Sequence, residues 1–125
     1  MKVKLKDLIK SSQALMLLSQ IDLPVLTSHE ISKVIVKVRK ELEAYDEVRI
    51  KLIKQYGVED EVTKQFDILK ASEENQKVFY DDINTLIEKE IDLNVDAISI
   101  DKLKSEKQET LIKSNILADL DFLIK

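Results

Sequence analysis

The longest apolar pattern in the chain predicts a single helix over residues 28–56. Apolar or aromatic side chains recur there at spacings of four and three, which places them on one face of a helix. They are Ile31, Ile35, Val38, Leu42, Tyr45, Leu52 and Tyr56. Ser28 suits the capping position before the first turn, and Gly57, the only glycine, suits a left-handed residue after the last turn. At 1.5 Å per residue, such a helix would be about 43 Å long.

Two short segments predict a small β-sheet. Residues 2–5 alternate Lys with Val and Leu, and residues 91–95 alternate apolar with polar side chains, as half-buried strands do. A third candidate strand, at residues 66–69, lies in the connector that follows the long helix. This connector is long for a link between two helices, so we expect it to contain structure of its own.

Three further helices are expected. Residues 6–23 form a pattern that is apolar almost all round and ends before Pro24, because a residue that precedes proline is disfavoured in the α region. Ser72 is expected to cap a second long helix that ends near Glu90. Ser114 is expected to open a short final helix that carries Leu120 and Leu123.

Together these elements predict one domain over residues 1–125, of the α+β class but mostly α. Its main feature would be a long antiparallel two-helix hairpin. A shorter N-terminal helix and a small β-sheet of two or three short strands would complete it. Hydrophobic residues make up 44% of the chain and charged residues 35%, so a packed core is possible.

Composition excludes many kinds of chemistry. The chain has no Cys, one His and one Gly. A thiol nucleophile, a thiolate zinc site and a glycine-rich loop that cradles phosphate are therefore excluded. Neighbouring acids on a helix point about 100° apart and do not converge on a metal or a substrate by themselves. We expect no catalytic residue, no cofactor and no metal, and therefore no enzyme.

Membrane insertion is not expected either. The longest run without a charged residue is only eleven residues, from Ser11 to Ile21, whereas a membrane-spanning helix needs about 20 mostly apolar residues. A cytoplasmic location is the resulting expectation.

Charge is distributed unevenly between the two halves of the chain. Residues 1–57 carry 11 basic and 7 acidic side chains, a net charge of +4, whereas residues 58–125 carry 9 and 17, a net charge of −8. The simplest interpretation is that the halves fold against each other and expose solvated faces. Alternatively, the acidic half, with Glu59, Asp60 and Glu61 at one connector, meets a basic partner surface. With an isoelectric point near 5.1 and two Arg, direct binding of nucleic acid is not expected.

Arg49 occupies a position of the long helix where the apolar pattern requires a core side chain. An unpaired charge there would be costly, so we expect a carboxylate of the facing helix (Glu88, Glu90 or Asp82) to meet it. Alternatively, Val48 takes the core position and Arg49 extends toward solvent. A third possibility is that Arg49, beside Tyr45, anchors a partner or ligand.

Several stretches of the chain resemble a group of viral proteins. The matching stretches are Lys2 to Leu5, Leu23-Pro24, Glu41 to Gly57 and Glu90 to Leu93. In this pattern the chain resembles small helical proteins of unknown function encoded by tailed bacteriophages and prophages. The resemblance implies a phage or prophage origin and no known catalytic residue.

Two hypotheses for function follow. The first is a non-enzymatic protein–protein interaction or structural accessory protein. The alternative is an acidic inhibitor that mimics nucleic acid and binds a host nucleic-acid-binding protein such as a defence nuclease. The partner would be a protein in either case. A homodimer is also possible, because the apolar positions exceed what one helical hairpin can cover.

Overall fold

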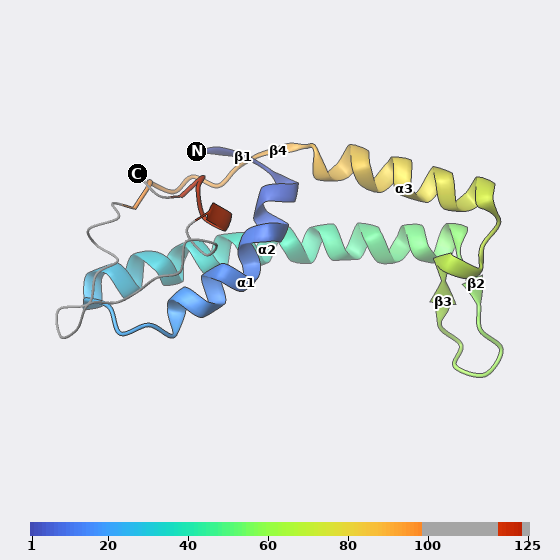
Figure 1. Ribbon diagram of the computed structural model, residues 1–125, viewed down its shortest axis with the longest axis horizontal. Coiled ribbons are helices and arrows are strands. Elements are labelled where there is room, and N and C mark those ends of the chain that lie inside the picture. The colour runs from blue at the N-terminus through green and yellow to red at the C-terminus, as the bar shows by residue number, and fades with distance from the viewer. Residues whose placement is uncertain (99–117, 124–125) are drawn as a thin grey trace.

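The computed structural model describes residues 1–98 and 118–123 and is mostly helical (Figure 1). Its elements follow in the order β1 (Lys2–Lys4), α1 (Leu5–Ser19), α2 (Val25–Tyr56), β2 (Val58–Glu59), β3 (Phe66–Asp67), the 3-10 helix η1 (Ile68–Lys70), α3 (Glu73–Ile87) and β4 (Glu90–Asp92). Within the described residues these strands form two small antiparallel sheets. The expectation of a mostly helical α+β fold is therefore confirmed. The predicted start of a final helix at Ser114 lies outside the described residues.

The hydrophobic core lies where α1 crosses the N-terminal half of α2. Helix α1 buries side chains three or four positions apart, as an amphipathic helix does. The core comprises Val3, Leu5, Leu8, Ala14, Leu15, Leu18, Leu23, Ile31, Val34, Val38, Leu93, Ile98, Leu120 and Leu123. We call this part of the molecule, residues 1–41, 90–98 and 118–123, the body.

Strands β1 and β4 bring the two ends of residues 1–92 together. They pair antiparallel, with Lys2 opposite Asp92, Val3 opposite Ile91 and Lys4 opposite Glu90. Val3 is buried between two exposed lysines, as the alternating pattern predicts. The pairing of the N-terminal segment with the segment near residue 93 is thereby confirmed.

Helix α2 is continuous, as predicted, and at 32 residues it is about 48 Å long. Its start differs from the prediction. The helix begins at Val25, after Pro24, and the Ser28 hydroxyl donates to the carbonyl of Leu23 at 3.4 Å instead of capping the helix. Pro24 lies at the capping position with an extended ψ of 145°, and it disfavours the α region for Leu23 before it, so the helix starts directly after the proline.

Gly57 ends α2 for a reason other than the predicted one. Its backbone is extended (φ −81°, ψ 174°), not left-handed. A Cβ at this position would lie 2.5 Å from the carbonyl oxygen of Ile53 and 3.2 Å from the backbone carbon of Asp67. Glycine is therefore required because a side chain would collide with the last turn of α2 and also press on β3, which lies close by.

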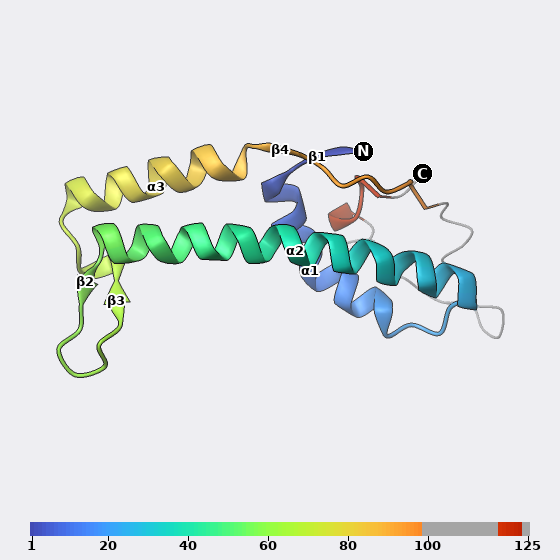
Figure 2. The same cartoon turned by 180° about the vertical axis from the view of Figure 1, so that it is seen from behind.

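The C-terminal half of α2, the β2–β3 hairpin and α3 form an elongated arm, residues 42–87. In this arm α3 runs back beside α2, and the hairpin projects from the opposite side of α2 (Figures 1 and 2). The Ser72 hydroxyl accepts the N–H of Asn75 at 3.2 Å, so Ser72 caps α3 as predicted. Helix α3 has only 15 residues, so the N-terminal half of α2 packs on α1 instead.

Candidate functional site

The structure does not place Arg49 against the facing helix. Its Nε donates to Oδ1 of Asp46 at 3.0 Å, one turn earlier in α2, and its side chain is 40% exposed. Neither predicted arrangement is present, since Val48 is also exposed and Glu88 binds other partners. The physical reason is the thinness of the arm, which leaves this position in contact with water and within reach of a carboxylate of its own helix.

Tyr45 packs against the hydrophobic core. It is partly buried and lies against the edge of the hydrophobic core, with Leu42 and Leu86. Tyr45 therefore packs on the core, whereas Arg49 pairs with a surface carboxylate, although both lie on the same apolar stripe of α2. Tyr45 marks the place where the body ends and the arm begins.

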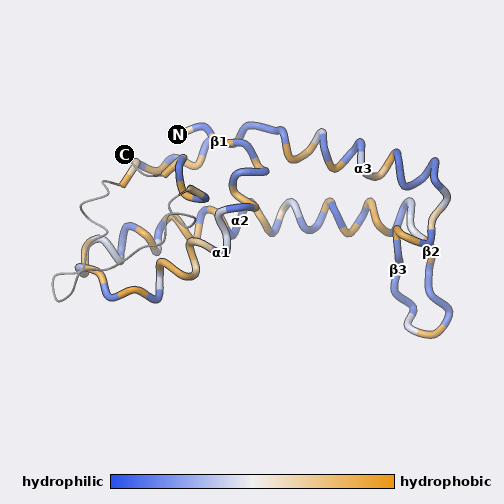
Figure 3. The backbone as a smooth tube through the Cα atoms, in the orientation of Figure 1, coloured by the Kyte–Doolittle hydropathy of each residue, from blue (hydrophilic) through white to orange (hydrophobic). Residues whose placement is uncertain are grey.

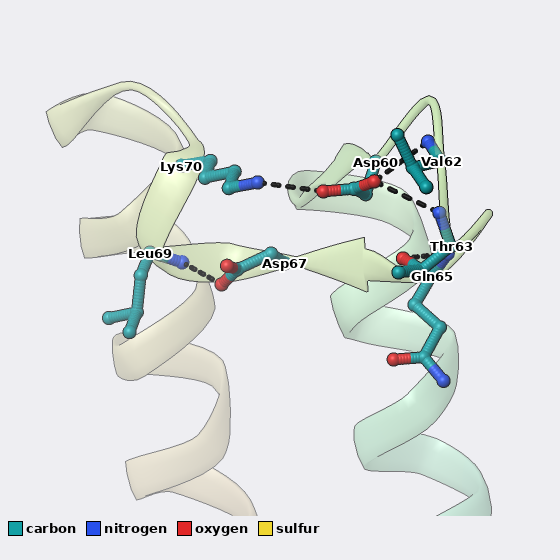
Figure 4. A network of polar contacts seen from close by, with 7 residues as sticks. All are labelled: Asp60, Val62, Thr63, Gln65, Asp67, Leu69 and Lys70. Atoms are coloured by element: carbon teal, nitrogen blue, oxygen red, sulfur yellow. Dashed lines mark hydrogen bonds and ion pairs between the residues drawn. The ribbon is translucent and has the colours of Figure 1, made fainter.

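Asp60 organises the turn of the β2–β3 hairpin (Figure 4). Its Oδ1 accepts the N–H groups of Val62 at 2.8 Å and Thr63 at 3.0 Å, and its Oδ2 accepts Lys70 Nζ at 2.9 Å. The hydrogen bonds from the Thr63 amide, Lys70 and the Val62 amide lower the pKa of Asp60 to about 2. Asp60 is therefore a structural acid.

The other two predicted acids of the hairpin differ from Asp60. Glu59 lies in β2 opposite Phe66, and Glu61 lies in the turn; both are exposed. Lys64 and Lys70 lie in the same segment, so its acids are interspersed with bases. The sequence Glu59-Asp60-Glu61 thus gives one turn-forming residue and two surface charges.

A second charged cluster, which the sequence analysis missed, joins the arm to the body. Glu88 accepts Lys4 Nζ through Oε2 at 2.9 Å and Lys6 Nζ through Oε1 at 2.8 Å. Bonds from Lys6 and then Lys4 lower the pKa of Glu88 to about 2, and the bond to Glu88 raises the pKa of Lys4. The β1–β4 register could have revealed this cluster, because it places Lys4 opposite Glu90, two residues after Glu88.

One face of α2 carries two apolar grooves. The first, the α1–α2 groove, is lined by Ser12, Leu15, Met16, Ile35, Val38, Arg39, Leu42, Glu43 and Asp46. The second, the hairpin groove, is lined by Arg49, Ile50, Ile53, Lys54, Lys64, Gln65 and Phe66. The α2 positions 35, 39, 42, 46, 49 and 53 recur at spacings of four and three, so they lie on one side of the helix.

The arm buries very little of its apolar surface. Between residues 39 and 87 only Ala71 and Phe79 are buried. The large apolar side chains of the arm that remain exposed are Val48, Ile50, Val58, Val62, Phe66, Leu69, Val78 and Tyr80. Hydrophobic positions recur along the whole of α2 and at the tip of the hairpin (Figure 3). The arm therefore offers apolar surface on several sides.

Other kinds of site have no counterpart in the described part of the chain. Across residues 1–98 and 118–123, no group of three or more His or acidic side chains is arranged to hold a metal ion. Among the helices described, none combines the length and the apolarity needed to span a bilayer.

Comparisons with protein-family models, curated proteins and solved structures gave no match to this chain.

Proposed function

We propose that this chain acts by binding another protein through its arm, as a non-enzymatic interaction or structural accessory protein. The observation that carries this proposal is the burial of only Ala71 and Phe79 between residues 39 and 87. In the arm, α2 and α3 cover one face of each other, and no third layer among the described residues covers their outer faces or the hairpin. Isolated two-stranded hairpins are only marginally stable in water. A protein partner would supply the missing layer.

The distribution of exposed apolar side chains supports a protein partner over a solvated spacer. Eight of the 13 large apolar side chains that are exposed in the described residues lie in the arm. They include Phe66 and Tyr80, and aromatic residues are enriched where proteins bind one another. If the chain derives from a phage or prophage, as its resemblance implies, the partner is a phage or host-cell protein.

Two described acids count against the alternative function, an acidic nucleic-acid mimic. A mimic needs a row of uncompensated negative charges. Asp60 is paired with Lys70, and Glu88 is paired with Lys4 and Lys6. Exposed lysines further interrupt such a row. They are Lys64 and Lys77 in the arm and Lys89 at its junction with the body.

The test is affinity capture from the native source with matched surface variants. Ile50→Lys and Tyr80→Lys place a charge on the arm, at side chains that are 44% and 46% exposed. Val36→Lys is the control, because Val36 lies in the body half of α2 and is 49% exposed. A protein that co-purifies with the wild type and Val36→Lys, but is lost with an arm variant, is then purified and its Kd measured against all four chains.

The proposal expects the Kd to rise at least tenfold for one of the arm variants, because burying an unpaired lysine at a contact costs more than 1.4 kcal/mol. The Kd of Val36→Lys should stay within twofold of the wild type. If every captured protein binds the arm variants as well as it binds the wild type, the arm is not the docking element and the proposal is wrong.

A further inference from the structure

The hairpin groove combines an apolar floor with a basic rim. Ile50 and Ile53 of α2 and Phe66 of β3 supply its apolar surface, and Ile50 and Phe66 are 44% and 37% exposed. Arg49, Lys54 and Lys64 supply its charged groups. The groove has a volume of about 570 Å³, which lies within the range of sites that enclose a ligand or several side chains.

The lining of this groove contains no carboxylate. Lys54 and Lys64 have no ion-pair partner among the described residues, and Arg49 is paired with Asp46 through Nε alone. The two terminal nitrogens of the Arg49 guanidinium therefore keep their N–H donors for a second carboxylate. This is a basic site in a chain whose formal net charge is −4, which distinguishes it from the rest of the arm.

Both walls of the groove are held in place before any partner arrives. On the hairpin side, the Asp60 carboxylate fixes the turn, and the N–H of Lys64 donates to the carbonyl of Asp60 at 2.9 Å. Lys64 adopts a left-handed backbone conformation with φ 61° in that turn. On the helix side, the bond to Asp46 orients Arg49. Binding would therefore cost little ordering of the hairpin turn and of Arg49, whereas the side chains of Lys54 and Lys64 would still lose rotamer freedom.

We propose that the hairpin groove binds an acidic segment of the protein partner that carries a large apolar side chain. The apolar side chain would pack against Ile50, Ile53 and Phe66, and neighbouring carboxylates would meet Arg49, Lys54 and Lys64. This inference rests on the proposed function and adds the chemistry of the partner. Charge complementarity identifies the occupant, since the exposed apolar floor calls for a hydrophobic side chain and the rim calls for negative charge.

The α1–α2 groove does not support the same inference. Its volume is about 220 Å³, and its rim mixes Arg39 with Glu43 and Asp46, so it selects neither sign of charge. Nucleic acid also carries negative charge, but it offers no aliphatic side chain for Ile50 and Ile53.

The test uses fluorescence anisotropy with the whole chain and a fluorescein-labelled peptide in which glutamates alternate with leucines and phenylalanines. Two control peptides replace every glutamate with glutamine, or every leucine and phenylalanine with serine. The double variant Lys54→Gln, Lys64→Gln removes two rim charges. Lys40→Gln, Lys51→Gln is its matched control, because these exposed lysines of α2 lie outside the groove. Circular dichroism verifies that each variant is folded.

The glutamate peptide should bind more tightly than either control peptide. The Kd should rise about tenfold for the rim variant and less than twofold for the matched control, because each rim charge contributes a factor of a few at a partly exposed site. The proposal is overturned if the peptide does not bind, if the glutamine peptide binds equally well, or if both double variants weaken binding alike. Tighter binding of a DNA oligonucleotide of equal charge would assign the groove to nucleic acid and also overturn it.

These outcomes separate the inference from the proposed function. A partner that is lost with Tyr80→Lys but retained by the rim variant would leave the arm as the docking element and remove the groove from the contact. Loss of the partner with the rim variant, together with binding of the glutamate peptide, would support both proposals.

Discussion

Replacing Gly57 tests why the chain has its only glycine at the end of α2. A left-handed backbone would tolerate asparagine better than alanine, because asparagine adopts left-handed φ and ψ values more readily than any other residue except glycine. The structure instead has an extended backbone with β3 close by. In that geometry both Gly57→Ala and Gly57→Asn bring a Cβ into the carbonyl oxygen of Ile53, and asparagine gains no advantage.

The expected loss of stability follows from that contact. A Cβ 2.5 Å from a backbone oxygen forces β3 or the last turn of α2 to shift, which weakens the bond from the Gly57 N–H to the Ile53 carbonyl, now 2.7 Å long. Such overpacking costs about 1–3 kcal/mol, from which about 0.4–1 kcal/mol is subtracted because the unfolded chain loses freedom when glycine is replaced. Each variant should therefore lose up to about 2.6 kcal/mol, with about 1.3 kcal/mol at the middle of the range.

Urea unfolding followed by two spectroscopic signals measures this loss. All three tyrosines of the chain (Tyr45, Tyr56 and Tyr80) lie in the arm, so near-ultraviolet circular dichroism reports on the arm, while the signal at 222 nm reports on all helices. The midpoint of the tyrosine signal should fall in both variants. If Gly57→Asn keeps the wild-type midpoint while Gly57→Ala lowers it, the residue is left-handed and the argument from close approach fails.

Three further outcomes are expected. Arg49→Ala should lower the free energy of unfolding by less than about 1 kcal/mol in urea titrations, because its bond to Asp46 is an exposed pair, whereas a loss above about 3 kcal/mol would indicate a buried charge pair. The pKa values of Asp60 and Glu88 are lowered in the folded state, so their stabilising contribution is present above the unfolded values of 3.8 and 4.5 and is lost as pH falls toward about 2. Thermal melts between pH 6 and pH 2 should show this loss, and a Glu88→Gln, Asp60→Asn variant should reduce the slope; an unchanged slope would contradict the assignment. The homodimer expected from the uncovered apolar positions should appear as a dimer in light scattering at micromolar concentration, and a monomer would refute that expectation.

The sequence predicted those elements whose pattern is set by local spacing. The apolar repeat of α2 requires a continuous helix, the alternation at residues 2–5 requires a strand, and Ser72 supplies its own hydrogen bond to the helix it caps. In each case the deciding contact lies within the element or between strands of complementary pattern. The start of α2 was misplaced because Ser28 competes with Pro24, and periodicity does not rank a capping side chain against a proline.

The candidate site was less predictable, because it depends on what covers each face. The pattern placed Arg49 on the apolar stripe but did not show which elements cover that stripe. It could therefore not predict that Arg49 pairs with Asp46 of its own helix while Glu88 pairs with lysines of the body. Phe66 and Lys64 join the hairpin groove only because β3 folds back against the end of α2. Nothing in the spacing of residues 64–66 and residues 49–54 indicates that approach.

The length of α2 also explains why one face of it remains available to a partner. An apolar repeat of seven residues drifts by about 20° per heptad around a straight helix, so the stripe turns by about 60° between Ile31 and Leu52, three heptads apart. One straight partner helix cannot follow that turn, which accords with α2 packing on α1 at one end and on α3 at the other. Helix α1 crosses the N-terminal half of α2 and the hairpin packs at its C-terminal end, and the face of α2 that lines the two grooves runs between these contacts (Figures 1 and 2). Both grooves open onto that face, and the hairpin groove is the one that lies wholly on the arm.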